Sequence, residues 1–203
     1  DELENGGDVN NLPNILTQEN AASRLIKDIA TGQTMVRPDA YNNRFSDLDG
    51  LPFLDRPLVY DNTAFFHRPK RTHMAGRGCP FRCQYCFEQD WNKMFEGKGK
   101  LLQRYSVGRF IDELEWVGQH YDTRFWKFYD DVFPTFPNDI SWLEDFSVQY
   151  RERIGLPFHC LTRADLVVKK PEVLDLLKDA GAASITMSIE SGNAFIRDHI
   201  ITR

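Results

Sequence analysis

The chain has 203 residues, 41% hydrophobic and 27% charged, which is enough apolar material for one sizeable core. Its formal net charge of -5 argues against nucleic-acid binding through a general basic surface, and no apolar run approaches the length needed to span a membrane. Four cysteines, three of them clustered, and the lack of a charged-then-apolar signal segment favour a cytoplasmic protein over a secreted disulfide scaffold.

The first part of the chain is predicted to be an irregular linker. Residues 1–43 are rich in Asn, Asp and Gly, and residues 47–57 contain two prolines and a glycine that favour an extended, turn-like course. Leu48, Leu51 and Phe53 give the second stretch apolar side chains with which to dock on a core. On physical grounds alone an ordinary linker is the simplest interpretation of residues 47–57.

The stretch of residues 76–87 holds three of the four cysteines, Cys79, Cys83 and Cys86, in the spacing Cys-x3-Cys-x2-Cys. A disulfide would leave one of them over and would be strained at such short separations, and a structural zinc site needs four ligands. The fourth cysteine, Cys160, is isolated and is predicted to be a buried strand residue. Three thiolates without a fourth partner suit an iron–sulfur cubane in which one iron stays open, so we expect the three sulfurs to lie within a few Å of one another.

From Arg71 onward the pattern alternates between strand and helix. The expected strands are residues 72–75, 125–129, 157–162 and 183–189. The expected helices are residues 107–121 with Ser106 as N-cap, one beginning at Asn138 or Asp139, one from Pro171 to Gly181, and one starting at Asn193. Such alternation predicts an α/β fold of parallel βαβ units.

Polar residues follow the ends of the predicted strands, at the edge where parallel sheets collect their chemistry. They are Asp130, Asp131, Arg163, Ser188 and Glu190. Each has an ordinary explanation on its own, because helix caps, turns and surfaces also use these residue types. Their joint position favours a binding site, and we expect Asp131, Arg163 and Glu190 to face the side of the sheet on which the cysteine loop lies.

The motif Cys-x3-Cys-x-aromatic-Cys, with Tyr85 as the aromatic residue, resembles that of the radical S-adenosylmethionine (radical SAM) superfamily. The resemblance implies a partial (β/α) barrel of the TIM type, of which residues 72–203 would supply about the first four βα units. On this interpretation residues 58–203 are a truncated radical SAM core, and residues 1–57 are a linker or the tail of a missing N-terminal domain.

Two further segments resemble the branch of that superfamily with an N-terminal cobalamin-binding domain. The stretch from Leu48 to Arg56 is similar to the connector that precedes the cysteine loop, and Asn11-Leu12-Pro13-Asn14-Ile15 to the tail that leaves the cobalamin domain. The Phe-Tyr-Asp-Asp sequence that ends at Asp131 replaces the Gly-Gly-Glu of many members, as in that branch. We therefore expect the natural protein to begin before Asp1 and to continue past Arg203 with at least two more βα units.

The resemblance also implies roles for the site residues. Cys79, Cys83 and Cys86 would hold a [4Fe-4S] cluster, while S-adenosylmethionine would contact Tyr85 near the adenine, Asp130 or Asp131 at the amino group, Arg163 at the carboxylate, and Ser188 and Glu190 at the ribose and methionine end. The planar fork of Arg163 suits a carboxylate, so its loss is expected to weaken binding of S-adenosylmethionine with little change in iron content.

The implied activity is reductive cleavage of S-adenosylmethionine, with an electron from a flavodoxin-like or ferredoxin-like donor, to start radical chemistry on a small-molecule substrate. Methyl transfer or ring rearrangement with cobalamin is known in that branch. The alternative is a non-catalytic iron–sulfur or zinc domain with an electron-transfer or structural role. A polar rim of Asp131, Arg163 and Glu190 favours the enzyme, because an electron carrier has no use for it.

Overall fold

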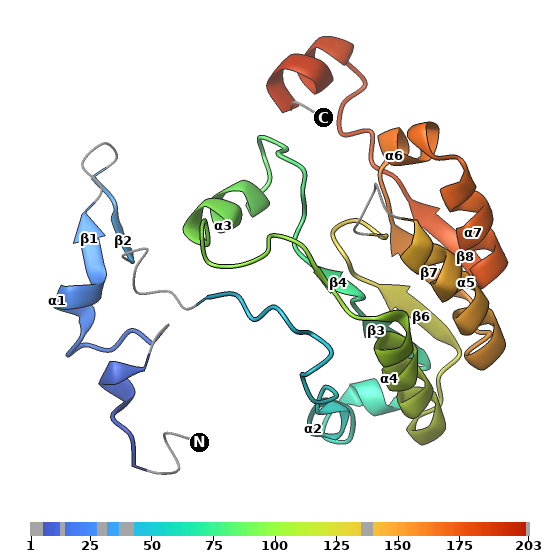
Figure 1. Cartoon of the computed structure of the whole chain (residues 1–203), viewed down its shortest axis with the longest axis horizontal. Helices are drawn as coiled ribbons and strands as arrows, with labels where there is room; N and C mark the ends of the chain where they lie inside the picture. The colour runs from blue at the N-terminus through green and yellow to red at the C-terminus, as the bar shows by residue number, and fades with distance from the viewer. Residues whose placement is uncertain (1–5, 13–14, 28–31, 37–42, 135–139, 202–203) are drawn as a thin grey trace. The chain divides into compact units, whose positions relative to one another are not determined.

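The computed structural model describes residues 6–12, 15–27, 32–36, 43–134 and 140–201. They form two compact units, Asp1–Ser46 with Gln89–Lys100, and Asp47–Glu88 with Leu101–Arg203. The smaller unit includes the 3-10 helix η1 (Val9–Asn11), α1 (Ala21–Arg24), β1 (Leu25–Lys27), β2 (Thr34–Val36) and most of α3 (Glu88–Met94). Figure 1 labels α1, β1, β2 and α3. β1 and β2 pair as a short antiparallel ribbon that the sequence did not predict.

The larger unit carries a parallel sheet of four strands in the order β3-β6-β7-β8. Its strands are β3 (Lys70–His73), β6 (Phe125–Phe128), β7 (Phe158–Leu161) and β8 (Ala182–Thr186), and a separate antiparallel pair is formed by β4 (Gly76–Arg77) and β5 (Gln103–Arg104). Its helices are α2 (Arg56–Tyr60), the 3-10 helix η3 (Ala64–His67), α4 (Val107–His120), α5 (Ser141–Arg153), α6 (Ala164–Lys169), α7 (Glu172–Ala180) and the π-helix η4 (Ile196–Ile201).

The predicted α/β alternation is confirmed, with each strand close to its expected place. Ser106 caps α4 by accepting a hydrogen bond from the Arg109 amide at 3.3 Å. Gly181 ends α7 with φ of 105°, a left-handed conformation that glycine adopts without steric cost. Asn138 and Asp139 lie outside the described residues, and Ile140 occupies the N-cap position of α5. α6 was not predicted.

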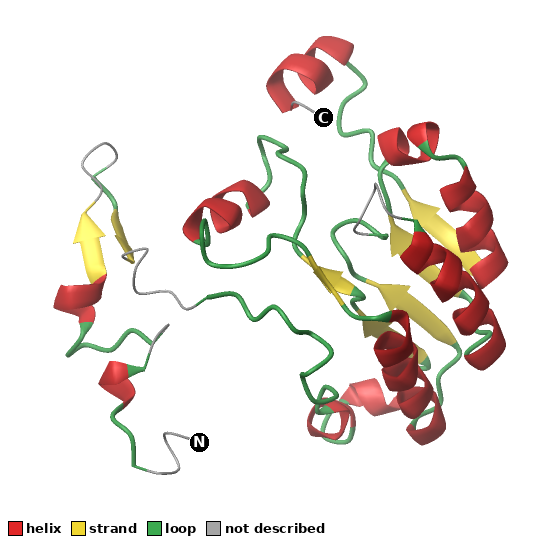
Figure 2. Ribbon diagram, in the orientation of Figure 1, coloured by secondary structure: helices red, strands yellow, loops and turns green. Residues whose placement is uncertain are grey.

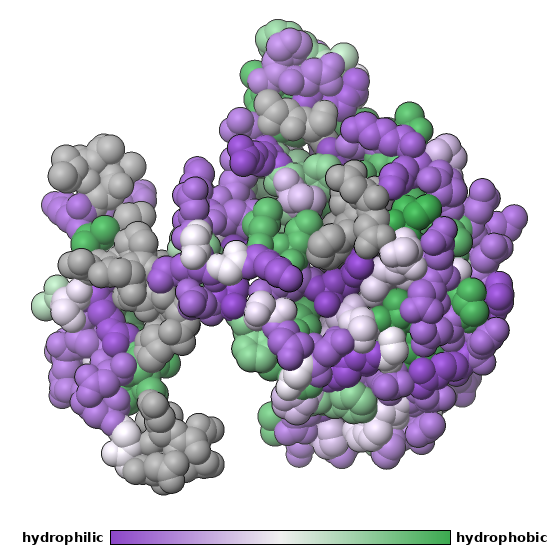
Figure 3. Space-filling view, viewed as in Figure 1, coloured by the Kyte–Doolittle hydropathy of each residue, from purple (hydrophilic) through white to green (hydrophobic). Residues whose placement is uncertain are grey.

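The helices α4, α5 and α7 lie on one side of the sheet (Figures 1 and 2). Alternate strand residues face them, because successive side chains of a strand point to opposite faces. The fully buried core between sheet and helices is dominated by aromatic side chains, among them Phe110, Phe128, Phe133, Phe146 and Phe158. The outer surface of these helices is mostly hydrophilic on the face shown in Figure 3.

The segment before α2 is docked on the larger unit. Leu48 is only 2% exposed, and the Asp49 carboxylate accepts a hydrogen bond from the Ser106 amide at 2.9 Å. The Arg109 guanidinium donates to the Leu51 carbonyl at 3.1 Å. These contacts hold the segment at the start of α4, and the predicted boundary between linker and core at residue 57 stays a prediction.

No helix among the described residues is long and apolar enough to cross a membrane.

Candidate active site at the carboxyl edge of the sheet

The cysteine loop begins directly after β4. Gly78 enters it with φ of 89°, and a Cβ at this position would lie 2.2 Å from the Leu101 carbonyl oxygen, so only glycine fits without a shift of backbone. Cys79 is buried and Cys83 and Cys86 are half-buried, and none of the four cysteines forms a disulfide. A hydrogen bond from the Cys86 amide to the Cys83 carbonyl, 3.0 Å, folds the end of the loop into a turn.

The three cysteines are a donor set that fits an iron–sulfur cluster. Within the part of the chain that the structure describes, no group of three or more His, Cys, Asp or Glu side chains is placed to hold a metal ion. Ligands of a cubane cluster bind different iron atoms, so this finding about a single metal ion leaves the expected convergence of the three sulfurs a prediction. Three thiols on one loop remain a chemically suitable set for an iron–sulfur cluster, and their role as ligands stays a prediction.

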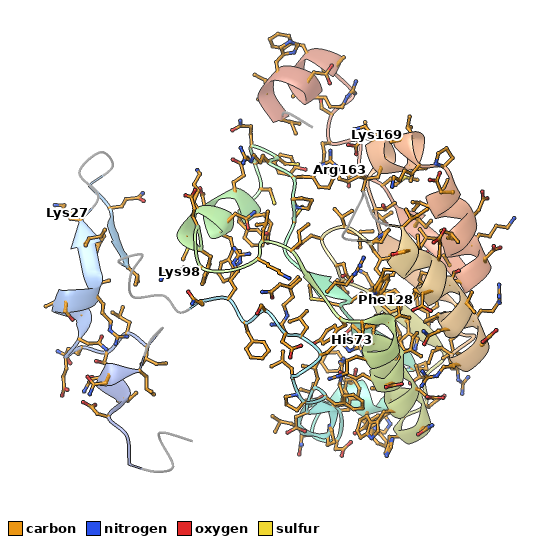
Figure 4. All side chains as sticks on the ribbon, viewed as in Figure 1. Lys27, His73, Lys98, Phe128, Arg163 and Lys169 are labelled. Atoms are coloured by element: carbon orange, nitrogen blue, oxygen red, sulfur yellow. The ribbon has the colours of Figure 1, made fainter. Side chains whose placement is uncertain are left out.

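Arg163, at the end of β7, reaches the cysteine loop (Figure 4). Its Nη1 lies 3.5 Å from the Cys83 sulfur, and its guanidinium carbon lies 3.8 Å from the centre of the Phe81 ring. A cation beside Cys83 suits a sulfur that would be a thiolate in a cluster. Arg163 thus contacts the cysteine loop, and its role in binding a cofactor stays a prediction.

Asp165 is a site residue that the sequence analysis missed. It binds Arg163 through both oxygens, at 2.9 Å from Nε and 3.1 Å from Nη2, so it occupies the fork that was expected to receive a carboxylate. Burial would raise the pKa of Asp165, but the hydrogen bonds and charge of Arg163 outweigh it and lower that pKa. The Arg-x-Asp spacing at the end of a strand was the available signal.

The two aspartates after β6 have different environments. Asp130 is 2% exposed, and its two oxygens accept hydrogen bonds from the Ala75 amide at 3.0 Å and the Gly76 amide at 2.7 Å. Burial raises the pKa of Asp130 to about 7, against the effect of these amide donors. Asp130 therefore ties the end of β6 to the entry of the cysteine loop.

Asp131 is exposed and lies near the loop. Burial is the main cause of the raised pKa of Cys79, and the negative charge of Asp131 contributes to the same shift. Of the two aspartates, Asp131 is thus the one accessible to a ligand, while Asp130 is engaged with backbone.

The remaining predicted residues are exposed. Tyr85 is 58% exposed in the loop, and Ser188 and Glu190 lie in the segment after β8, where Glu190 has a positive φ of 66°. A hydrogen bond from the Gln84 amide to the Ile201 carbonyl, 3.2 Å, links the cysteine loop to η4. The carboxyl edge thus gathers the cysteine loop, Asp131 and Arg163, and the places of Ser188 and Glu190 in the site stay predictions.

Cys160 is fully buried in β7, as predicted. Burial, with a smaller contribution from the charge of Asp130, raises its pKa to about 12. A thiol in this state is inert, and Cys160 is excluded from the site chemistry.

A parallel α/β sheet with a three-cysteine loop at its carboxyl edge defines a class of cofactor-dependent α/β proteins. The profile of the radical SAM superfamily matches residues 74–203, which include the cysteine loop and the ends of β6, β7 and β8. The chain belongs to the radical SAM superfamily. This family and the relatives below are enzymes, which rules against a non-catalytic metal domain.

Two curated relatives match part of the chain. The anaerobic magnesium-protoporphyrin IX monomethyl ester cyclase of Synechocystis is 26% identical over 125 residues, 61% of this chain and 23% of the cyclase. The cytidylyl-2-hydroxyethylphosphonate methyltransferase of Streptomyces wedmorensis is 29% identical over 119 residues, 58% of this chain and 20% of the methyltransferase. The chain thus spans less than a quarter of the length of either relative.

The fold is also that of a solved structure, the cobalamin-dependent S-adenosylmethionine radical enzyme OxsB. The form with aqua-cobalamin and S-adenosylmethionine bound superposes with a TM-score of 0.59 at 19% identity, over 94% of this chain and 26% of OxsB. The apo form gives a TM-score of 0.61 at 18% identity. This likeness supports the α/β fold of the radical SAM type expected from the sequence.

Proposed function

We propose that this chain is the cofactor-binding part of a radical SAM enzyme, with Cys79, Cys83 and Cys86 as ligands of a [4Fe-4S] cluster. The cluster, when bound, would supply the electron for reductive cleavage of S-adenosylmethionine. The observation that carries the proposal is the family match over residues 74–203 together with a loop of three thiols that Arg163 contacts directly.

The residues of the chain have three tasks in this proposal. Arg163, held by Asp165, positions Cys83 and the Phe81 ring. Asp130 fixes the start of the loop through two backbone amides. Asp131 is available to bind the amino group of S-adenosylmethionine, and Tyr85, Ser188 and Glu190 are available to its adenosine and methionine ends.

The whole enzyme would take its electron from a flavodoxin-like or ferredoxin-like donor in the cytoplasm. Cobalamin as a second cofactor is part of the proposal, supported by the connector from Leu48 to Arg56 and by the fold shared with OxsB. Its reaction would then be methyl transfer or a ring rearrangement on a small molecule.

Anaerobic reconstitution with iron and sulfide tests the proposal. We expect the chain to take up iron and to show an electron paramagnetic resonance spectrum that changes when S-adenosylmethionine is added. Cys83→Ser should lose more than half of the iron, while Cys160→Ser, a matched change at a buried thiol outside the site, should keep it. Equal iron in both variants would contradict the ligand assignment.

In the same assay, Arg163→Ala tests whether Arg163 supports the iron–sulfur cluster as well as the binding of S-adenosylmethionine. Because Arg163 contacts both Cys83 and Phe81, we now expect this variant to lose iron as well as affinity for S-adenosylmethionine, roughly tenfold in the latter for a charged hydrogen-bonding group. Lys169→Ala, an exposed cation six residues away, is the control and should change neither. If Arg163→Ala keeps the iron content of the wild type, Arg163 acts on S-adenosylmethionine alone, as predicted from the sequence.

A further inference from the structure

A polar row crosses the face of the sheet opposite the helices. One residue of each strand contributes to this row, and each pairs in register with the next. Thr72 pairs with Lys127, Lys127 with His159, and His159 with Ser184. Their neighbours along each strand, such as Phe128 and Cys160, are buried in the core, so the row lies on the other face. None of these four residues was singled out as a site residue by the sequence.

The row is connected by hydrogen bonds on the β8 side. The His159 Nδ1 lies 2.8 Å from the Ser184 hydroxyl, and its Nε2 lies 3.4 Å from the Thr186 hydroxyl. Burial is the main cause of the lowered pKa of His159, and the charges of Lys127 and Lys70 lower it further. The imidazole therefore lies near two positively charged lysines, and no carboxylate contributes to the shift of its pKa.

The lysines lack acidic partners in the described part of the chain. Lys127 lies 4.2 Å from the centre of the Tyr129 ring, and no ion pair with a carboxylate is found among the described residues for Lys127 or Lys70. Cations held together without acids raise the local concentration of anions. The net charge of the chain is -5, so this positive face is a local feature.

A cavity opens at the β3 end of the row. It has a volume of about 460 Å³, and Thr72 and Tyr129 line it together with Lys70, Arg68 and Arg71. Among the described residues, the Arg71 guanidinium donates hydrogen bonds to the carbonyl oxygens of Phe65, Phe66 and Asp122. The cavity is large enough for a small organic molecule and carries more cations than carboxylates.

We propose that this face binds the substrate through a phosphate or phosphonate group, held by Lys127 and Lys70 and by the hydroxyls and imidazole of Ser184, Thr186 and His159. The tetrahedral group offers three acceptor oxygens and a charge of about -1.5 to -2, which matches two cations and several donors better than a carboxylate does. The substrate role rests on the proposed radical SAM function, while the anion site itself does not.

Titration of the 203-residue chain with inorganic phosphate, followed by 31P nuclear magnetic resonance at low ionic strength, tests the site. Lys127→Gln should weaken phosphate binding at least fivefold, and Lys178→Gln, the same charge change on the exposed side of α7, should leave it within twofold. The His159 ring resonances of the wild-type chain should shift on adding phosphate, a readout that needs no variant to fold. Equal weakening in both variants, or no shift at His159, would overturn the site.

Two further arms define the ligand. Acetate at equal ionic strength should bind at least fivefold more weakly than phosphate, and acetate binding as tight as phosphate would overturn the phosphate assignment. A phosphate monoester, glycerol 2-phosphate, should bind at least as well as inorganic phosphate, and its exclusion would mark a site for the free ion and overturn the substrate role. The phosphate titration needs neither the cluster nor S-adenosylmethionine. If the chain assembles a cluster but does not bind phosphate, only this inference is overturned. If it binds phosphate but assembles no cluster, the proposed function is overturned instead.

Discussion

At the scale of single residues, Glu113 on α4 is a buried carboxylate with three basic side chains around it. It is 1% exposed and lies 2.9 Å from His73 Nε2, 3.0 Å from Arg109 Nη1 and 3.6 Å from Arg56 Nη2. It also accepts a hydrogen bond from the Leu54 amide at 3.3 Å. The group joins β3, α4 and the docked segment, and His73 lies beside Phe128 on the neighbouring strand (Figure 4).

Glu113→Gln is predicted to destabilise the fold strongly. Removing the carboxylate charge leaves the buried guanidinium group of Arg56 and the half-buried one of Arg109 without their anion, and breaking a buried pair in this way costs about 3–5 kcal/mol. Denaturant unfolding measures the loss. Glu115→Gln, on the same helix, removes an ion pair with Arg153 near the surface and should cost at most about 1 kcal/mol. A similar loss in both variants would contradict the importance of the buried group.

The same residue sets a pH dependence. Burial would raise the pKa of Glu113, but His73, Arg109 and Arg56 outweigh it and lower the pKa from its ordinary 4.5 to about 2. The unfolded chain therefore takes up a proton that the folded chain refuses, and stability falls as the pH drops from 4.5 towards 2. Burial also lowers the pKa of His73, which acts in the same direction below pH 6.5.

We expect the wild-type chain to lose up to about 3 kcal/mol more than Glu113→Gln over this acid range, measured by unfolding at each pH. Parallel stability curves for the two proteins would contradict this origin of the acid sensitivity.

At the scale of elements, the segment from Leu48 to Arg56 is part of the fold of the larger unit. Leu48→Ala is predicted to cost about 2–5 kcal/mol, because it empties a buried site at the contact between this segment and the core. Leu58→Ala, at a side chain 66% exposed on α2, is the matched control and should stay within about 0.5 kcal/mol of wild type. If thermal unfolding shows equal effects, the segment is not docked in solution.

At the scale of the whole chain, β8 is an outer strand of the four-stranded sheet and pairs with β7 alone among the described strands. The residues that follow it expose large apolar side chains, Met187, Ile189, Phe195, Ile196 and Ile200. An open strand edge beside apolar surface is a template for association.

We therefore predict that the 203-residue polypeptide self-associates as its concentration rises, as seen by sedimentation velocity. Ala183→Lys, which places a charge on the exposed edge strand, should shift the population towards monomer. Ala164→Lys, at an exposed residue on α6 outside that strand, is the control and should leave the association unchanged. A wild-type chain that stays monomeric at all concentrations would contradict the prediction.

The sequence by itself determined the family and the alternation of the four parallel strands with α4, α5 and α7. Apolar periodicity, the Ser106 cap and the Gly181 stop act within a few residues, so they can be recognised locally, and the spacing of Cys79, Cys83 and Cys86 is a motif of the chain itself. The tertiary structure decided which polar residues meet. Asp130 bonds to amides some 55 positions away, Asp165 takes the fork of Arg163, and strand register alone aligns Lys127 with His159. Such partners depend on burial and on pairing between distant segments, which no local pattern encodes.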